Sequence, residues 1–180
     1  MHDTEDKNWW CLHGANLEKK FVDFGKNRLG LNVKLNPEKE TNPYVPDLLY
    51  NEKLADLKTQ NTPFFTAKRY GFDPRYTVTF NRKDYERYKR LYPELIILFW
   101  VSWEQTQWKD MKVDYFGGVF GVRFSNLAEQ IETSKVPEHS YIHRKMDKGG
   151  NAKSSFLFDL RQFYTFIEFD NYKQNQSKQS

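Results

Sequence analysis

The spacing of apolar residues predicts a helix and then a strand at the start of the chain. Within residues 15–26, apolar side chains recur at helical intervals, at Leu17, Phe21 and Phe24. Residues 29–35 alternate between apolar and polar positions, as a short strand with one buried face does. The charged and proline-containing residues 36–43 that follow are typical of a loop.

Two strand-like runs come next and are close enough in sequence to form a hairpin. Residues 45–50 and 54–60 are short and rich in apolar positions, and Asn51-Glu52-Lys53 connects them. Proline and glycine then interrupt residues 61–76, which predicts an irregular segment.

A further strand, a basic helix and a fully apolar strand follow. Residues 77–80 predict a strand, and residues 82–92 predict a basic helix that Pro93 ends. Residues 95–101 are apolar at every position. A strand without polar positions is buried on both faces, as it is in the centre of a sheet covered by helices.

The second half of the chain continues the same mixture of elements. Residues 117–122 and 155–160 predict strands, and residues 124–133 predict a helix with Ser125 as its N-cap. The charged, glycine-containing residues 143–153 predict a loop. Helices and strands in this order predict an α/β fold with a mixed central sheet flanked by helices.

Composition narrows the class of protein without identifying its function. The 180 residues suit one domain, and a hydrophobic content of 38% allows a proper core. The formal net charge of +4 and the pI near 9.0 fit a polyanionic partner. The single cysteine, Cys11, excludes an intramolecular disulfide framework and a four-cysteine metal site. The polar first residues and the shortness of the longest apolar run predict a soluble, cytoplasmic protein without a membrane segment.

Charged residues gather on one face of the predicted hairpin. Because side chains alternate along a strand, Asp56, Lys58 and Gln60 share a face. Asp47 lies beside them on the neighbouring strand. Burying unpaired charge costs several kcal/mol, so this set is either a hydrated metal site or a plain solvent-facing surface.

The chemistry of this set suits a divalent cation. Mg²⁺ prefers hard oxygen ligands, and two carboxylates with the backbone carbonyl of Leu57 supply them. Bound Mg²⁺ acidifies water, and a lysine beside it orients the attacking water and stabilises developing negative charge. Asp47, Asp56 and Lys58 therefore predict hydrolysis of a phosphodiester with Mg²⁺ or Mn²⁺ as the cofactor.

One pattern along the chain is similar to the motif PD…(D/E)xK, which defines a superfamily of nucleases. It consists of a proline and an aspartate, eight intervening residues and a DxK triplet, here Pro46-Asp47 and Asp56-Leu57-Lys58. Many members also carry a glutamate on the first helix of the core, and Glu18 lies on the first predicted helix. Gln60 matches the extension (D/E)xKxQ of the exonuclease-like and RecB-like branches. The similarity covers about residues 14–101.

This resemblance implies a restriction-endonuclease-like core and a metal-dependent deoxyribonuclease that leaves 5′-phosphate products. The site residues that it implies are the metal ligands Asp47, Asp56, Leu57 (through its carbonyl) and Glu18, with Lys58 acting on the water and Gln60 supporting the site. A homodimer is implied where both strands are cut, although no particular residue specifies one. No small-molecule cofactor is expected.

Basic residues near the hairpin are candidates for contacts with DNA, the expected partner. Lys68, Arg69 and Arg75 follow the catalytic strand, and Arg82 and Lys83 begin the basic helix. The alternative for this helix is a solvated face whose tyrosines cover the sheet.

A single nuclease domain is expected over residues 1–171, followed by a disordered tail at 172–180. Its core spans about residues 14–101, and about residues 102–171 form a C-terminal elaboration. Two tryptophans of the elaboration are candidates for a groove or an oligomer interface, Trp103 and Trp108.

The sequence leaves several functions open. A non-catalytic DNA-binding or assembly module would keep the same fold, and RNA or another phosphate ester would suit the same chemistry. Nothing in the residues chooses among endonuclease, exonuclease, junction resolvase and restriction roles, because these depend on oligomer geometry and on loops.

Overall fold

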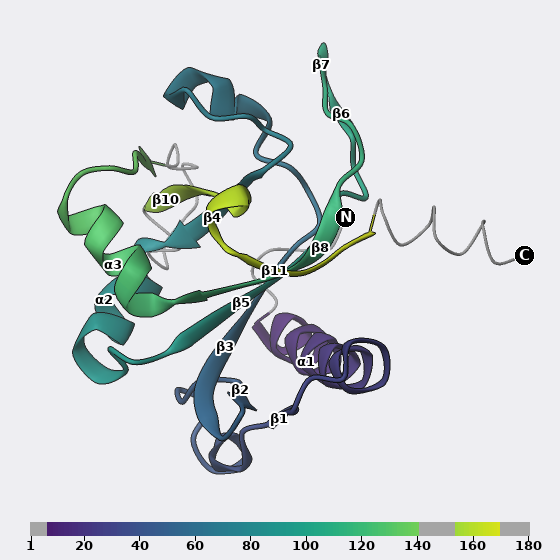
Figure 1. Ribbon diagram of the computed structural model, residues 1–180, viewed down its shortest axis with the longest axis vertical. Coiled ribbons are helices and arrows are strands. Elements are labelled where there is room, and N and C mark those ends of the chain that lie inside the picture. The colour runs from purple at the N-terminus through teal and green to yellow at the C-terminus, as the bar shows by residue number, and fades with distance from the viewer. Residues whose placement is uncertain (1–6, 141–153, 170–180) are drawn as a thin grey trace, which may run out of the picture.

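The fold is organised around one six-stranded mixed sheet. The computed structural model, drawn in Figure 1, has the strand order β1-β2-β3-β5-β8-β11. These strands are β1 (Val33–Leu35), β2 (Leu48–Tyr50), β3 (Lys53–Gln60), β5 (Ile96–Ser102), β8 (Gly117–Arg123) and β11 (Tyr164–Glu168). β3 and β5 are parallel, whereas the other neighbouring strands are antiparallel. With helices on both sides of this sheet, the predicted α/β fold is confirmed.

The structure describes the backbone of residues 7–140 and 154–169, and side chains from residue 16 onward within these ranges. The predicted loop at 143–153, the predicted tail at 172–180 and the side chain of Cys11 lie outside the described residues. None of the described helices is both long and apolar enough to cross a membrane.

The long helix α1 (Lys7–Leu29) covers one face of the central sheet (Figure 1). It includes the predicted helix at 15–26 and extends beyond it at both ends. Phe21 is fully buried in a cluster with one apolar side chain from each of four strands, Val33, Leu48, Leu57 and Leu98. Because Leu57 belongs to this cluster, the odd-numbered residues of β3 face α1 and the even-numbered residues face away from it.

A smaller sheet and two helices cover the opposite face. The sheet has the order β4-β10-β9 and consists of β4 (Thr77–Asn81), β10 (Ser154–Asp159) and β9 (Glu138–Ser140). The helices α2 (Arg82–Leu91) and α3 (Phe124–Glu132) lie beside it (Figure 1). Aromatic rings fill this layer and are almost fully buried, among them Phe80, Tyr88, Phe99, Phe120 and Phe158. Much of the aromatic content of 17% is therefore used in the core.

The second half of the chain contributes more to the two sheets than its sequence predicts. β8 and β11 complete the central sheet, and the strand at residues 164–168 is not predicted from the sequence. The strands predicted at 77–80 and 155–160 pair with each other in the smaller sheet. The central sheet thus takes two of its six strands from the part of the chain beyond residue 101.

Two local expectations are wrong. The N-cap residue of α3 is Arg123, so Ser125 is not the cap and lies exposed in the first turn. Trp103 is fully buried in the core, where it lines neither a groove nor an interface. Trp108, in contrast, is partly exposed on a small hairpin formed by β6 (Gln107–Trp108) and β7 (Met111–Lys112).

The turn between β2 and β3 is shorter than predicted and carries backbone strain. Only Asn51 and Glu52 lie between the paired residues Tyr50 and Lys53, and their φ angles are positive, 48° and 60°. Two-residue turns of this kind favour Asn-Gly, because a side chain at positive φ is sterically unfavourable. We expect Glu52→Gly to raise the free energy of unfolding by about 0.5–1 kcal/mol, measured by urea denaturation.

Loss of the ion pair that Glu52 makes is expected to change the free energy of unfolding very little. Lys34 Nζ lies 2.9 Å from Glu52 Oε2, and both side chains are exposed. Lys34→Gln breaks the same ion pair without changing the turn, and its stability should match that of the original protein. A less stable Glu52→Gly protein would contradict the strain at this turn.

Candidate active site

The hairpin of β2 and β3 brings two aspartates together at one edge of the central sheet. Leu48, the first residue of β2, pairs with Ala55, and the register continued by one position would set Asp47 opposite Asp56, whose charge raises the pKa of Asp47. Opposite residues of an antiparallel pair share a face and have Cβ atoms about 5 Å apart. The two carboxylates that the sequence singles out are therefore neighbours.

Lys58 follows Asp56 on the same face of β3 and makes an ion pair with it. The Lys58 ammonium is 2.8 Å from Asp56 Oδ2 and 2.7 Å from Asp84 Oδ2, and the Tyr88 hydroxyl lies 3.5 Å away. Asp56 is only 3% exposed, so protein charge rather than water neutralises it. Its Oδ2 contacts Lys58 without hydrogen-bond geometry and has no hydrogen bond to any described residue.

Asp84, in the first turn of α2, is a site residue that the sequence analysis does not single out. It binds Lys58 from the side opposite Asp56, and its other oxygen, Oδ1, accepts a hydrogen bond of 3.0 Å from Arg87. Arg87 also donates to the Tyr88 hydroxyl at 2.7 Å. The only sequence signal is the spacing of Asp84 and Tyr88, which places them on one face of the helix.

A second lysine, Lys39, joins Glu18 of α1 to Asp47. Its Nζ is 2.7 Å from Glu18 Oε1 and also contacts Asp47 Oδ1. Lys39 lies on the short 3₁₀ helix η1 (Pro37–Glu40), in the segment where the sequence predicts only a loop. The ammonium of Lys39, which contacts both carboxylates, therefore links Glu18 to Asp47.

Asn36 fixes the segment that carries Lys39. It is buried, and its side-chain oxygen accepts a hydrogen bond of 3.1 Å from the backbone N–H of Glu38 at the start of η1. Its side-chain amide donates to the carbonyl of Pro46, and its backbone N–H donates to the carbonyl of Asp47, both at 2.9 Å. These bonds hold η1 against the residues that precede β2.

The backbone of Leu57 is directed toward the same edge of β3. The residues that flank a two-residue turn form a hydrogen-bonded pair, so the odd-numbered residues of β3 direct their N–H and C=O groups toward β2. β2 pairs with β3 only as far as Leu48 opposite Ala55. The alternation therefore directs the Leu57 carbonyl to the side where Asp47 lies.

Burial and neighbouring charges shift the pKa values of the site in opposite directions. Burial, and next the charge of Asp56, raise the pKa of Asp47 to about 7 against the opposing effect of Lys39. For Asp56, burial is outweighed by the Lys58 ammonium and smaller effects, which lower its pKa. The pKa of Lys58 is raised well above its ordinary value because attraction to Asp56, and to a smaller extent Asp84, outweighs burial. Asp56 and Lys58 are thus both charged at neutral pH.

The donor set fits a divalent cation, although lysines now neutralise it. Within residues 16–140 and 154–169, no three His, Cys, Asp or Glu side chains are already gathered as metal ligands. Lys39 instead binds two carboxylates at once, and Lys58 contacts the buried Oδ2 of Asp56 at 2.8 Å. Carboxylates that converge on positive charge are the ligands that hard cations prefer.

Gln60 shares the strand face but is engaged elsewhere. Its side-chain amide donates to the carbonyl of Thr62 at 2.8 Å, and its side-chain oxygen accepts from the backbone N–H of Thr79 at 3.2 Å. These contacts connect the end of β3 to β4 and hence the two sheets. Gln60 therefore lies near the site without directing its amide to Lys58.

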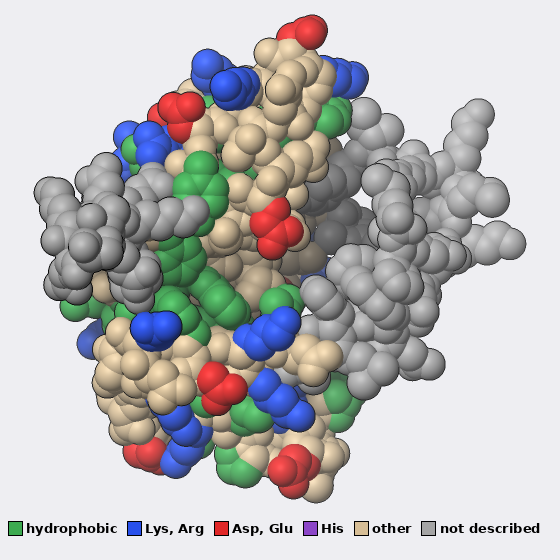
Figure 2. Space-filling view, turned by 90° about the vertical axis from the view of Figure 1, so that its right-hand side faces the viewer, with side chains coloured by type: hydrophobic (Ala, Val, Ile, Leu, Met, Phe, Trp, Pro, Cys, Tyr) green, Lys and Arg blue, Asp and Glu red, His purple; other side chains and the backbone are tan. Residues whose placement is uncertain are grey.

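Three of the predicted DNA-contacting residues are exposed. Lys68 and Arg69 lie on the 3₁₀ helix η2 (Phe65–Tyr70), and Lys83 lies in the first turn of α2. On the face shown in Figure 2, Lys and Arg side chains are interspersed with Asp and Glu. The charge distribution on that face therefore does not define a path for DNA by itself.

The other two predicted DNA-contacting residues are engaged within the protein. The Arg75 guanidinium lies over the rings of Tyr76 and Phe116, 5.5 and 5.8 Å from their centroids. Arg82 donates from Nε to Glu138 at 2.6 Å, which connects α2 to β9. These contacts give both arginines a structural role.

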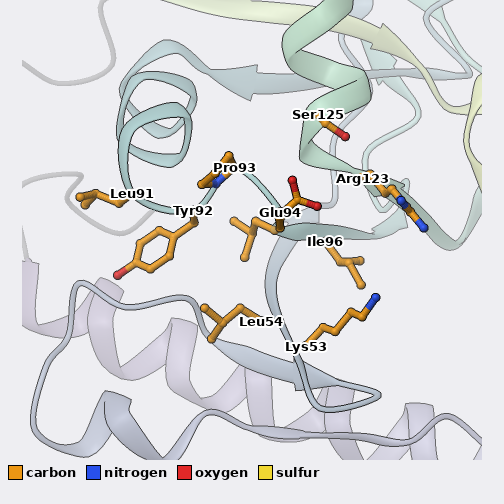
Figure 3. Close-up of a pocket in the computed structure, with 10 residues that line it drawn as sticks. Lys53, Leu54, Leu91, Tyr92, Pro93, Glu94, Ile96, Arg123 and Ser125 are labelled. Carbon is orange, nitrogen blue, oxygen red and sulfur yellow. The ribbon is translucent and has the colours of Figure 1, made fainter.

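A hollow of about 500 Å³ lies between the end of α2, the start of β3 and the start of α3 (Figure 3). Its walls include the apolar side chains of Leu54, Tyr92 and Ile96. Two basic side chains, Lys53 and Arg123, extend toward the same side of it in Figure 3. None of the predicted site residues lines this hollow, so it is separate from the candidate site.

Comparison with solved structures gives a distant structural match. No family model matches the chain, and no curated protein matches it. Among solved structures, D212, described as a nuclease from a fusselovirus, superposes with a TM-score of 0.38 and 11% sequence identity. The match covers 92% of this chain and 89% of that one. The chain is thus distantly similar in structure to a viral nuclease, and its function has to be inferred from its own site.

Proposed function

We propose that this protein is a divalent-metal-dependent nuclease with a PD-(D/E)xK active site on a restriction-endonuclease-like core. The observation that carries the proposal is the proximity of Asp47 to Asp56, with Lys58 paired to Asp56 on the same strand face. Glu18, from a helix on the other face of the sheet, converges on Asp47 at the sheet edge. Three carboxylates and a lysine from three separate segments have no evident use in packing.

The chain's own groups divide the work of phosphodiester hydrolysis. Asp47, Asp56, the Leu57 carbonyl and Glu18 would hold Mg²⁺ or Mn²⁺. When bound, the metal supplies an acidified water and offsets negative charge on the scissile phosphate. Lys58 stays protonated between its carboxylate partners, so it acts as a hydrogen-bond donor that orients the attacking water and stabilises developing charge.

The contacts of Lys58 also explain how it is oriented. Asp56 and Asp84 hold its ammonium from two sides, at 2.8 and 2.7 Å. Arg87 fixes the second of these carboxylates through the bond to its Oδ1. Lys58 is thereby preorganised on rigid elements, as a group acting in a transition state requires.

DNA cleavage is tested by a gel assay with supercoiled, linear, single-stranded and branched DNA, each with Mg²⁺, Mn²⁺ or EDTA. Cleavage of at least one DNA form with a metal and none with EDTA is expected. An RNA substrate in the same series identifies a ribonuclease. Cleavage that persists in EDTA would overturn the metal-dependent mechanism.

A second candidate function is a non-catalytic DNA-binding module that keeps this fold. The observation that favours it is the pairing of Glu18, Asp47, Asp56 and Asp84 with lysines, as in a purely structural ion-pair network. Calorimetry with Mn²⁺ separates the two functions. If the protein is a nuclease, it binds Mn²⁺ and the Asp47→Asn variant does not. If it is a non-catalytic module, it binds DNA but does not bind Mn²⁺.

The exposed residues Lys68 and Arg69 are expected to contact DNA phosphates. The double variant Lys68→Gln, Arg69→Gln should weaken DNA binding. The slope of log Kd against log salt concentration should also fall by about 2, because two phosphate contacts are lost. Its single-turnover cleavage rate at saturation should be unchanged. The matched control is Arg90→Gln, Lys135→Gln, which changes two exposed residues, one in the last turn of α2 and one in the segment after α3. An equal loss in this control would exclude a specific role for η2.

A further inference from the structure

Lys39 is bound where the carboxylates of the proposed metal site converge. It contacts Glu18 Oε1 at 2.7 Å and also Asp47 Oδ1. The Lys39 side chain is 26% exposed, and those of Glu18 and Asp47 are 14% and 19% exposed. Charges in a partly desolvated cluster interact more strongly than the exposed ion pairs of a protein surface do.

The position of Lys39 is built into the fold. Buried Asn36 begins η1 and is hydrogen-bonded to the carbonyls of Pro46 and Asp47. The segment that delivers the lysine is therefore attached to the residue whose carboxylate it neutralises. The nearby pair of Lys34 and Glu52 shows the contrast, because its side chains are 47% and 65% exposed.

We propose that Lys39 is a tethered counter-ion that competes with the divalent metal for Glu18 and Asp47, so that metal binding displaces Lys39. This rests on the proposed function. Mg²⁺ requires carboxylate oxygens at about 2.1 Å, and an ammonium bound to the same oxygens repels it. Asp56 does not share this competition, because Lys58 rather than Lys39 neutralises it.

The displacement is sterically simple. The backbone of η1 stays anchored through Asn36, while the flexible four-carbon side chain of Lys39 already reaches solvent at the edge of the sheet. Lys39 thus offsets part of the negative charge of Glu18 and Asp47 when no metal is bound. It also lowers the affinity for metal, so that the site fills only at a sufficient metal concentration.

Mn²⁺ binding to the full chain, freed of metal with EDTA and dialysed, tests the proposal. Free Mn²⁺ is measured by electron paramagnetic resonance and binding heat by calorimetry, with no substrate present. Lys39→Met keeps the length of the side chain without its charge and should bind Mn²⁺ about tenfold more tightly than the original protein, which corresponds to roughly 1.4 kcal/mol. Lys39→Arg retains the charge and should bind as the original protein does.

The matched control is Lys34→Met, which removes a lysine from an exposed ion pair outside the site and should leave the Mn²⁺ affinity unchanged. Lys39→Gln gives the same measurement if Lys39→Met does not fold. Equal or weaker Mn²⁺ binding by the uncharged Lys39 variants, with binding still lost in Asp47→Asn, would overturn the competition and leave the nuclease site intact. If neither the original protein nor the Lys39 variants bind Mn²⁺, both the competition and the metal site are wrong.

Discussion

Asp56→Asn is expected to abolish metal-dependent cleavage, with a loss in kcat/KM of at least about a thousandfold, or ~4 kcal/mol of transition-state stabilisation. The amide keeps the shape of the side chain but removes the charge that faces Asp47 and pairs with Lys58. Lys58 keeps its partner Asp84 at 2.7 Å, so the protein should still fold. Initial rates on the best DNA form with Mg²⁺, together with circular dichroism, measure both effects.

Asp159→Asn is the matched control for this variant. Asp159 ends β10 in the smaller sheet and pairs with Arg161, away from the hairpin. It should retain full cleavage activity. A fully active Asp56→Asn protein would exclude the proposed site. Lys58→Ala is a poorer test, because it would leave Asp56 and Asp84 without their shared cation and cost on the order of 3–5 kcal/mol in stability.

Asp47→Asn is expected to stabilise the metal-free protein at pH 8 while it removes metal binding. Burial and the charge of Asp56 raise the pKa of Asp47 from 3.8 to about 7. An ionised Asp47 is therefore unfavourable in the folded state, whereas asparagine carries no charge to bury. The gain in the free energy of unfolding should be on the order of 2 kcal/mol, less than the full pKa shift implies because Lys39 loses a partner.

Because the pKa of Asp47 is raised in the folded protein, the stability difference between the two proteins depends on pH. Between pH 4 and pH 7 the folded protein retains a proton on Asp47 that the unfolded chain has released, so its stability falls as pH rises through this window. Asparagine removes that dependence, and the two proteins should converge toward pH 4. Urea denaturation in EDTA at several pH values measures the difference. Asp159→Asn should change stability in the opposite direction at neutral pH, because Arg161 outweighs burial and lowers the pKa of Asp159.

Local periodicity predicts the elements of the fold better than their partners. Most of residues 95–101 are buried, as their unbroken apolar run indicates, and the hairpin forms where two short runs lie close in sequence. The pairing of Phe80 with Phe156 joins residues far apart in the chain, and no spacing within either strand specifies it. β11 is not predicted because its sequence lacks a clear alternation of buried and exposed positions. Its positions are half-buried or exposed, and its register against β8 shifts.

The site residues also differ in whether nearby sequence or tertiary packing determines their position. Asp47, Asp56 and Lys58 are set by the register of one hairpin, which sequence spacing gives directly. Lys39 and Asp84 reach the site only through the packing of a loop and a helix against that hairpin. Neither belongs to a motif, and each carries a charge that a solvated surface would explain equally well.

The last strand of the central sheet has a consequence for how the protein is made. β8 pairs with β5 on one side and with β11 on the other, and its glycines at 118 and 121 leave room for the backbone of Ile167 and the ring of Phe166. Until the ribosome has released residues 164–168, this apolar strand presents an open edge to other nascent chains. Completion of the sheet therefore waits for residues 164–168, and before they are available the chain is prone to aggregate through the open edge of β8.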